Sequence, residues 1–181
     1  TKTPICNFGE KPHSFELKDV TEKVCNFKDL TGEKGTLIMF ICNHCPYVKA
    51  VIKDIVNDAN NLKNLNINTI AIMSNDTKNY PDDSFENMVK FSKINKFNFP
   101  YLLDETQETA KKYGAVCTPD FFGYNRDLEL QYRGRIRELR DLKPVSTGKS
   151  DLFNAMKMIA ETGKGPQNQI PSMGCNIKWF K

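Results

Sequence analysis

Two cysteines separated by two residues, in the stretch FICNHCPYV at 40–48, are the groups in this sequence best suited to chemistry. Cys42 and Cys45 enclose His44, and Pro46 follows directly. Thiols at this spacing on a helix share one face, so Cys45 is placed to resolve a mixed disulfide formed on Cys42. A histidine stabilises a nearby thiolate through an N–H donor or a positive charge. The stretch predicts a reversible dithiol with Cys42, Cys45 and His44 as catalytic residues.

The elements around the cysteines predict where the pair lies. The apolar run 36–41 is typical of a strand buried on both faces, and it leads directly into Cys42. Apolar residues then recur at steps of three and four, which predicts an amphipathic helix over 43–65. A strand that ends at a helix N-terminus would place Cys42 among unpaired N–H groups at the positive end of the helix dipole, where a thiolate is stabilised.

The rest of the chain alternates strands with helices, which indicates one layered α/β domain over 1–181 with a mostly parallel sheet and a final antiparallel pair. The further elements expected are a hairpin or loop over 12–30, a strand over 67–74, a helix over 82–96, a strand and helix over 100–113, two strands joined by a turn at 125–127, and a helix over 148–161. Gly, Pro and Gln are frequent after 161, which predicts an irregular C-terminal tail over 162–181.

Composition narrows the classes of partner and compartment. The 181 residues carry 26 Lys and Arg against 22 Asp and Glu, so nucleic acid is not an expected partner. Six cysteines with a single close pair do not form the framework of a disulfide-rich scaffold. No run is long and apolar enough to span a bilayer, and the N-terminus lacks the apolar core of a signal peptide. We expect a cytoplasmic protein, or a periplasmic one if a signal peptide has been removed.

Metal binding is the main alternative chemistry for the cysteine pair. A structural zinc site needs four ligands, and no second close pair of cysteines or histidines is present. Copper would have Cys42, Cys45 and either His44 or His13. We therefore expect no metal and no cofactor beyond a redox-active Cys42–Cys45 disulfide. A copper or zinc carrier and a pair of inert buried cysteines stay as alternatives.

The motifs FICNHCPYV, CTPDFF (117–122), YRGR (132–135) and GCNIKW (174–179) together resemble the thioredoxin-like superfamily. Within it they are most similar to bacterial redoxins of the AhpC/TSA family, and the likeness covers about 12–179. The resemblance implies a thioredoxin-like fold with a central mixed β-sheet flanked by helices. It further implies a strand–helix insertion before a cis-proline and an N-terminal hairpin.

The resemblance also implies a substrate groove. In the superfamily the proline of such a Thr-Pro pair is cis and packs against the cysteines, which here indicates Thr118 and Pro119. The backbone of Thr118 is expected to pair with a substrate strand, and we also assign substrate contact to Asn43. Thr36 stands where thioredoxin has a buried acid, so the proton acceptor for Cys45 is not identified by the resemblance.

Three further residues are expected as accessories. Arg133 alternates with Arg135 and Arg137, and these cations would steer anionic substrates or keep a thiolate charged, unless they form a solvated strand face. Cys117 is either close to the pair or a small buried side chain. Cys175 is either a redox partner of the pair or a packed tail cysteine.

These observations predict a thiol–disulfide oxidoreductase that exchanges disulfides with protein or low-molecular-weight thiol substrates and is served by an electron donor. A histidine before the second cysteine is similar to protein disulfide isomerases and periplasmic disulfide oxidases, which implies a less reducing pair than that of thioredoxin. A thiol-dependent peroxidase is the leading alternative. The Pro-x-x-x-Thr-x-x-Cys pattern of a peroxiredoxin fails at both cysteines; counting back from Cys42 gives Met39 and Gly35.

Overall fold

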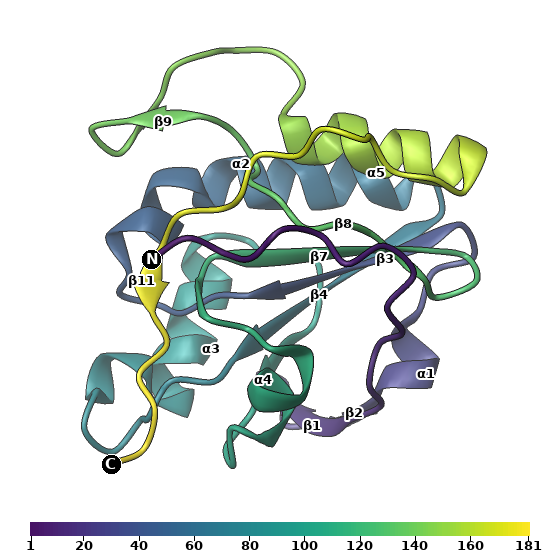
Figure 1. Ribbon diagram of the computed structural model, residues 1–181. Helices are drawn as coiled ribbons and strands as arrows, with labels where there is room; N and C mark the ends of the chain where they lie inside the picture. Colours follow the sequence, from purple (N-terminus) through teal and green to yellow (C-terminus); the bar gives the residue numbers. More distant parts are fainter.

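The computed structural model describes residues 1–181 and is built around a seven-stranded mixed sheet with the strand order β2–β1–β5–β4–β3–β7–β8 (Figure 1). The three central pairings differ in direction, because β3 and β4 and likewise β4 and β5 are parallel, whereas β7 runs antiparallel to β3. The strands of this sheet are β1 (Glu16–Asp19), β2 (Val24–Asn26), β3 (Gly35–Phe40), β4 (Ile67–Met73), β5 (Tyr101–Leu103), β7 (Asp120–Asn125) and β8 (Leu130–Tyr132).

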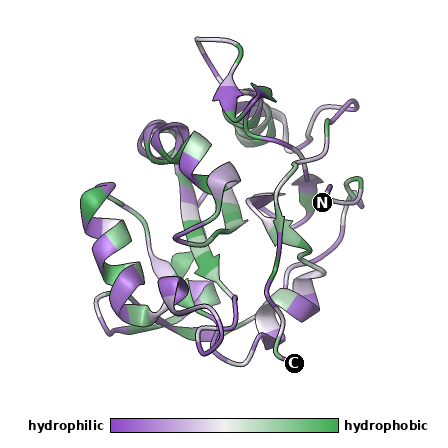
Figure 2. Ribbon diagram, turned by 90° about the vertical axis from the view of Figure 1, so that its left-hand side faces the viewer, coloured by the Kyte–Doolittle hydropathy of each residue, from purple (hydrophilic) through white to green (hydrophobic).

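Helices cover both faces of the sheet. They are α1 (Phe27–Leu30), α2 (Pro46–Lys63), α3 (Phe85–Ile94), α4 (Glu108–Tyr113) and α5 (Asp151–Thr162), with a 3₁₀ turn η1 (Pro81–Asp83) before α3. Alternation along β3 divides the core, because Leu37 and Met39 pack with α2, α3 and α5 while Ile38 and Phe40 pack with α1 and α4. Figure 1 shows α2 and α5 side by side over one face, and Figure 2 shows the hydrophobic strands enclosed between the layers. The end of β3 is therefore packed on both of its faces.

Two short antiparallel pairs lie outside the central sheet. One joins β6 (Cys117–Thr118) to β11 (Cys175–Asn176), and the other joins β9 (Leu139–Arg140) to β10 (Lys143–Pro144). The first pair brings the C-terminal segment against the end of the sheet where the cysteines lie. None of the helices has the length and apolar character needed to cross a membrane.

The architecture confirms the predicted thioredoxin-like fold, with the hairpin β1–β2 and with β5 and α4 as the strand–helix insertion. The expectation of a mostly parallel sheet is wrong, because only β3–β4 and β4–β5 pair parallel while the other four pairings are antiparallel. Some boundaries also differ from the prediction. The first long helix begins at Pro46 rather than at 43, since proline lacks an N–H and suits the first helical position. The tail over 162–181 is not wholly irregular, because it contains β11.

Candidate active site

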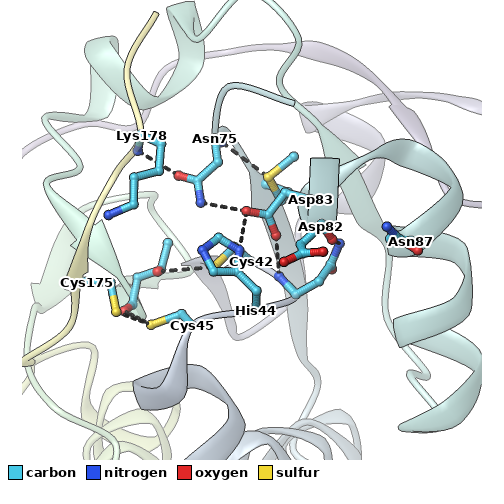
Figure 3. Close-up of polar contacts among 12 residues, drawn as sticks. Cys42, His44, Cys45, Asn75, Asp82, Asp83, Asn87, Cys175 and Lys178 are labelled. Atoms are coloured by element: carbon cyan, nitrogen blue, oxygen red, sulfur yellow. Dashed lines mark hydrogen bonds and ion pairs between the residues drawn. The ribbon is translucent and has the colours of Figure 1, made fainter. Parts of the chain in front are cut away.

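Cys42 and Cys45 lie between the end of β3 and the start of α2 (Figure 3). Both of their sulfurs contact Thr118. The Cys42 Sγ lies 3.5 Å from the Thr118 Oγ1, and the Cys45 Sγ lies 3.3 Å from the Thr118 carbonyl oxygen. The residue Cys42 is 1% exposed and Cys45 is 0% exposed. The bond between Thr118 and Pro119 is cis, as the resemblance implied. The structure thus brings together four of the predicted site residues.

Helix α2 acts on the second cysteine rather than the first. Cys45 is the N-cap residue of α2, and its carbonyl accepts hydrogen bonds from the N–H groups of Val48 and Lys49 at 3.1 and 2.9 Å. The expectation that Cys42 occupies the helix N-terminus is wrong, because Pro46 moves the first turn beyond it. The electrostatic benefit of the helix end therefore falls on the Cys45 sulfur.

The two thiols have opposite pKa shifts. The hydrogen bond with Cys42 lowers the pKa of Cys45, and the contacts of Cys45 with Cys175, Thr118 and Val48 act in the same direction. That same hydrogen bond raises the pKa of Cys42, with burial and the charge of Asp83 acting in the same direction. These opposite directions favour a negative charge on Cys45 over one on Cys42, the sulfur for which the sequence predicts a thiolate.

A buried carboxylate stands behind the motif. Asp83 is fully buried and accepts hydrogen bonds from the Asn43 N–H at 2.8 Å and from the Asn75 Nδ2 at 2.9 Å. The Nδ1 of His44 approaches the same carboxylate to 2.6 Å without hydrogen-bond alignment, so this buried nitrogen has no hydrogen-bond partner. The His44 ring also stacks parallel to the ring of Tyr80. A proton carried by His44 would thus lie beside a negative charge.

The side chain of Asn43 has internal partners instead of a substrate-facing position. Its Oδ1 accepts a hydrogen bond from the Tyr101 hydroxyl at 2.7 Å, and its Nδ2 donates to the Asp82 carbonyl at 3.2 Å. Asn43 is 7% exposed. The prediction that Asn43 contacts substrate is corrected, because both polar atoms of its side-chain amide bind other residues of the protein. These hydrogen bonds fix the loop between the cysteines.

Two accessory predictions are also corrected. The Arg133 guanidinium bonds both oxygens of the fully buried Asp120, at 2.9 and 3.3 Å, so it neither steers substrates nor contacts the thiols, and it is not on a solvated face. Cys117 is adjacent to Thr118 in β6 but points to the other side, where its thiol contacts the Pro119 carbonyl at 3.7 Å. Burial raises the pKa of Cys117 to about 12. It matches the alternative of a small buried side chain.

The third accessory, Cys175, lies against the pair. Its Sγ is 2.8 Å from the Sγ of Cys45 (Figure 3). In the β6–β11 ladder Cys175 is opposite Thr118. Cys175 keeps part of its surface exposed, unlike the two motif cysteines. Three thiols therefore meet at one end of the sheet.

A cation has one candidate set of ligands here. Atoms of Cys42, His44 and Asp83 lie within 4.8 Å of one another, a set that replaces the Cys42, Cys45 and histidine set expected for copper. His13 instead packs edge-on against Tyr113. Both Asp83 oxygens already accept protein hydrogen bonds, which favours a structural and electrostatic role for this carboxylate.

Sequence reasoning missed Asp83, Asn75 and Tyr101. Asp83 belongs to a Pro-Asp-Asp-Ser run that is typical of a helix start, where acids stabilise the first turn, and so it carried no separate signal. The helix begins later, after the N-cap Ser84, and the 3₁₀ turn η1 directs Asp83 inward. No pattern in the sequence pairs Tyr101 with Asn43, because their contact depends on the order of the strands.

A thioredoxin-like fold with a Cys-x-x-Cys motif between β3 and α2, set against a Thr–cis-Pro pair, defines the class of this protein. The profile of the AhpC/TSA family matches residues 8–139. The chain belongs to the AhpC/TSA family, and this membership supports a redox function.

Solved structures extend the likeness to the whole chain. An uncharacterized conserved protein from Geobacillus kaustophilus is 40% identical, with a TM-score of 0.94 over 99% of this chain and 96% of that one. A hypothetical protein from Sinorhizobium meliloti is 31% identical, with a TM-score of 0.91 over 99% and 98%. A secreted disulfide oxidoreductase from Mycobacterium tuberculosis shares the fold at 18% identity, with a TM-score of 0.55 over 65% and 80%. No curated protein matches the chain.

Proposed function

We propose that the protein is a thiol–disulfide oxidoreductase whose redox pair is Cys42 and Cys45. The observation that carries this proposal is the contact of both sulfurs with Thr118, at 3.5 Å through its hydroxyl and 3.3 Å through its carbonyl. Two thiols held by one residue share a single proton, which suits an exchange in which one sulfur attacks and the other later resolves.

The reaction follows from that shared proton. Cys45 takes the proton of Cys42 as the Cys42 sulfur attacks a substrate disulfide, and one substrate thiolate leaves and is protonated by solvent. Cys45 then loses its proton and attacks the Cys42 sulfur of the mixed disulfide, which releases the second substrate thiol. Two electrons pass to the substrate, and a Cys42–Cys45 disulfide forms. An electron donor with a dithiol restores the starting state.

The surroundings supply the remaining parts. His44 lies beside Cys42 with an unpartnered Nδ1, so it is placed to hold a proton during the exchange. A cavity of about 480 Å³ opens beside Pro119, and its wall includes Tyr47, Ile136 and Met173. We assign the groups that flank a substrate disulfide, in a protein or a small thiol, to this cavity.

The Cys45→Ser variant tests the proposal. Incubated with glutathione disulfide, it is expected to accumulate a mixed disulfide on Cys42, because the resolving sulfur is absent. The matched control is Cys25→Ser, which removes a buried cysteine on the opposite face of the sheet. Equal, slow labelling of Cys42 in both variants would contradict the proposal.

A peroxide arm of the same experiment separates the alternative. A thiol peroxidase would form a sulfenic acid on Cys42 of the Cys45→Ser variant and would consume hydrogen peroxide much faster than free cysteine does. We expect peroxide consumption no faster than that of free cysteine. Fast consumption together with no glutathione adduct would replace the oxidoreductase assignment with the peroxidase.

A further inference from the structure

The C-terminal strand covers the redox pair with a third thiol. In the β6–β11 ladder Cys175 is opposite Thr118, and Asn176 is opposite Cys117. This register puts the Cys175 Sγ 2.8 Å from the Cys45 Sγ. Cys45 itself is fully buried, whereas Cys175 is partly exposed. Cys175 is therefore the thiol that connects the pair with solvent.

The strand is fixed on both sides of Cys175. Before it, the Gly174 N–H donates to the Thr1 carbonyl at 2.9 Å, and the Thr1 backbone nitrogen donates to the Gly174 carbonyl at 3.0 Å. After it, the Lys178 N–H donates to the Asn75 Oδ1 at 2.9 Å. The contact between the sulfurs is thus part of the fold and not the chance position of a loose tail.

Gly174 makes this close approach possible. A Cβ added at Gly174 would lie 2.1 Å from the Thr118 carbonyl oxygen, a separation that no side chain tolerates. Any larger residue would push β11 away from Thr118 and carry Cys175 away from Cys45. The position is thus a handle for moving the third thiol without changing any sulfur.

We propose that Cys175 is a third exchanging thiol, which moves the disulfide from the Cys42–Cys45 pair to a Cys45–Cys175 pair. The proposal rests on the proposed function for the formation of the first disulfide. The deprotonated Cys175 sulfur attacks Cys45, the bond between Cys45 and Cys42 breaks, and its electron pair passes to Cys42. Cys42 takes up the proton that Cys175 lost, so the step needs no further oxidant.

The step has a consequence for the electron donor. Cys45 is fully buried, so a Cys45–Cys175 disulfide offers a donor dithiol the partly exposed residue Cys175 instead. A donor dithiol attacks Cys175, forms a mixed disulfide with it, releases Cys45 and then leaves as its own disulfide. The substrate thus reacts at Cys42 and the reductant at Cys175.

Peptide mapping distinguishes the two disulfides. Cleavage after lysine puts Cys42 and Cys45 in one peptide, 35–49, and Cys175 in another, 165–178. After oxidation by one equivalent of glutathione disulfide and alkylation of free thiols, we expect the linked pair of peptides in at least about one tenth of the oxidised wild-type protein. That ratio corresponds to two disulfides whose potentials differ by no more than about 30 mV.

Variants identify the sulfurs and separate this inference from the proposed function. Cys42→Ser oxidised with diamide is expected to give peptides 35–49 and 165–178 joined by a disulfide. Gly174→Ala is expected to lack this link but to keep the Cys42–Cys45 disulfide within peptide 35–49. Dithiothreitol is expected to reduce oxidised Cys175→Ser about tenfold more slowly than wild type or Cys25→Ser.

Absence of linked peptides from both wild type and Cys42→Ser, with an intact Cys42–Cys45 disulfide in Cys175→Ser, would overturn this inference alone. Failure of Cys175→Ser to form any disulfide would instead overturn the proposed function.

Discussion

Replacement of Arg133 by Met removes the cation that pairs with the fully buried Asp120 carboxylate. Arg133 contacts Asp120 through Nη2 at 2.9 Å and Nε at 3.3 Å, donates to the Gly114 carbonyl at 3.0 Å, and lies over the Phe122 ring at 4.4 Å. Met fills much of the same volume, so the variant isolates the loss of charge and hydrogen bonds from the loss of packing.

The expected loss of stability is large. Removal of one member of a buried ion pair costs about 3–5 kcal/mol, because the other charge stays buried and unpaired. For a chain of this length each kcal/mol lowers Tm by about 2–4 °C, which gives a decrease of about 6–20 °C. The double variant Arg133→Met/Asp120→Asn is expected to regain more than half of that loss, since no charge is then left in the core.

The pH dependence provides a second test of the same pair. Burial raises the pKa of Asp120 even with Arg133 beside it, and removal of Arg133 raises that pKa further. A buried carboxyl with a raised pKa destabilises the folded state increasingly as pH rises. The difference in Tm between Arg133→Met and wild type is therefore expected to be larger at about pH 8 than at about pH 5.

Thermal unfolding and thiol labelling decide the result together. We expect the variant to exchange disulfides at the wild-type rate at temperatures where it is folded, because Arg133 does not contact the thiols. A loss of Tm below about 2 °C would refute the energetic argument. If the folded variant exchanges disulfides more slowly than wild type, Arg133 does act in the active site.

Three further outcomes are expected. Burial raises the pKa of Asp58 to about 6, so ionisation of Asp58 lowers the free energy of unfolding of the wild type by up to about 3 kcal/mol as pH rises from about 4 to 6. Asp58→Asn is expected to lack this decrease, which urea unfolding at both pH values measures. Asp83→Asn in the Cys45→Ser background is expected to shift alkylation of Cys42 to lower pH, since the charge of Asp83 raises that pKa; an unchanged pH profile would contradict this. Tyr101→Phe is expected to cost about 1–3 kcal/mol, measured by urea unfolding, because it leaves the buried Asn43 Oδ1 without its donor.

Periodicity and motif spacing were sufficient to predict the scaffold. The apolar run before Cys42 became β3, and the three- and four-residue steps after it became α2, because burial dictates both patterns. The pairing of the cysteines with Thr118 and Pro119 was implied by the resemblance of two motifs to the thioredoxin-like superfamily, not by spacing alone. The strand and the helix depend on local sequence, and the pairing depends on a fold that brings the two motifs together.

The electrostatic partners were beyond sequence reasoning. Arg133 and Asp120 are brought together by the β7–β8 hairpin, whose register shifts between Gly123 and Tyr124. The alternation of residues along one strand does not show which charged residue of the neighbouring strand lies beside them, because that depends on the register of the two strands. The sequence therefore predicts that Arg133 is an exposed or site-directed cation, although the fold buries it beside Asp120.

The separation of the β6–β11 pair from the central sheet has an evolutionary consequence. Because β6 and β11 form their own two-stranded sheet, β11 can detach without breaking a ladder hydrogen bond of the seven-stranded sheet. The free energy of this local opening is then set by a few tail contacts, whereas global unfolding is set by the core. Selection can thus tune access to the thiols and heat resistance as independent traits, by substitutions at different places in one chain.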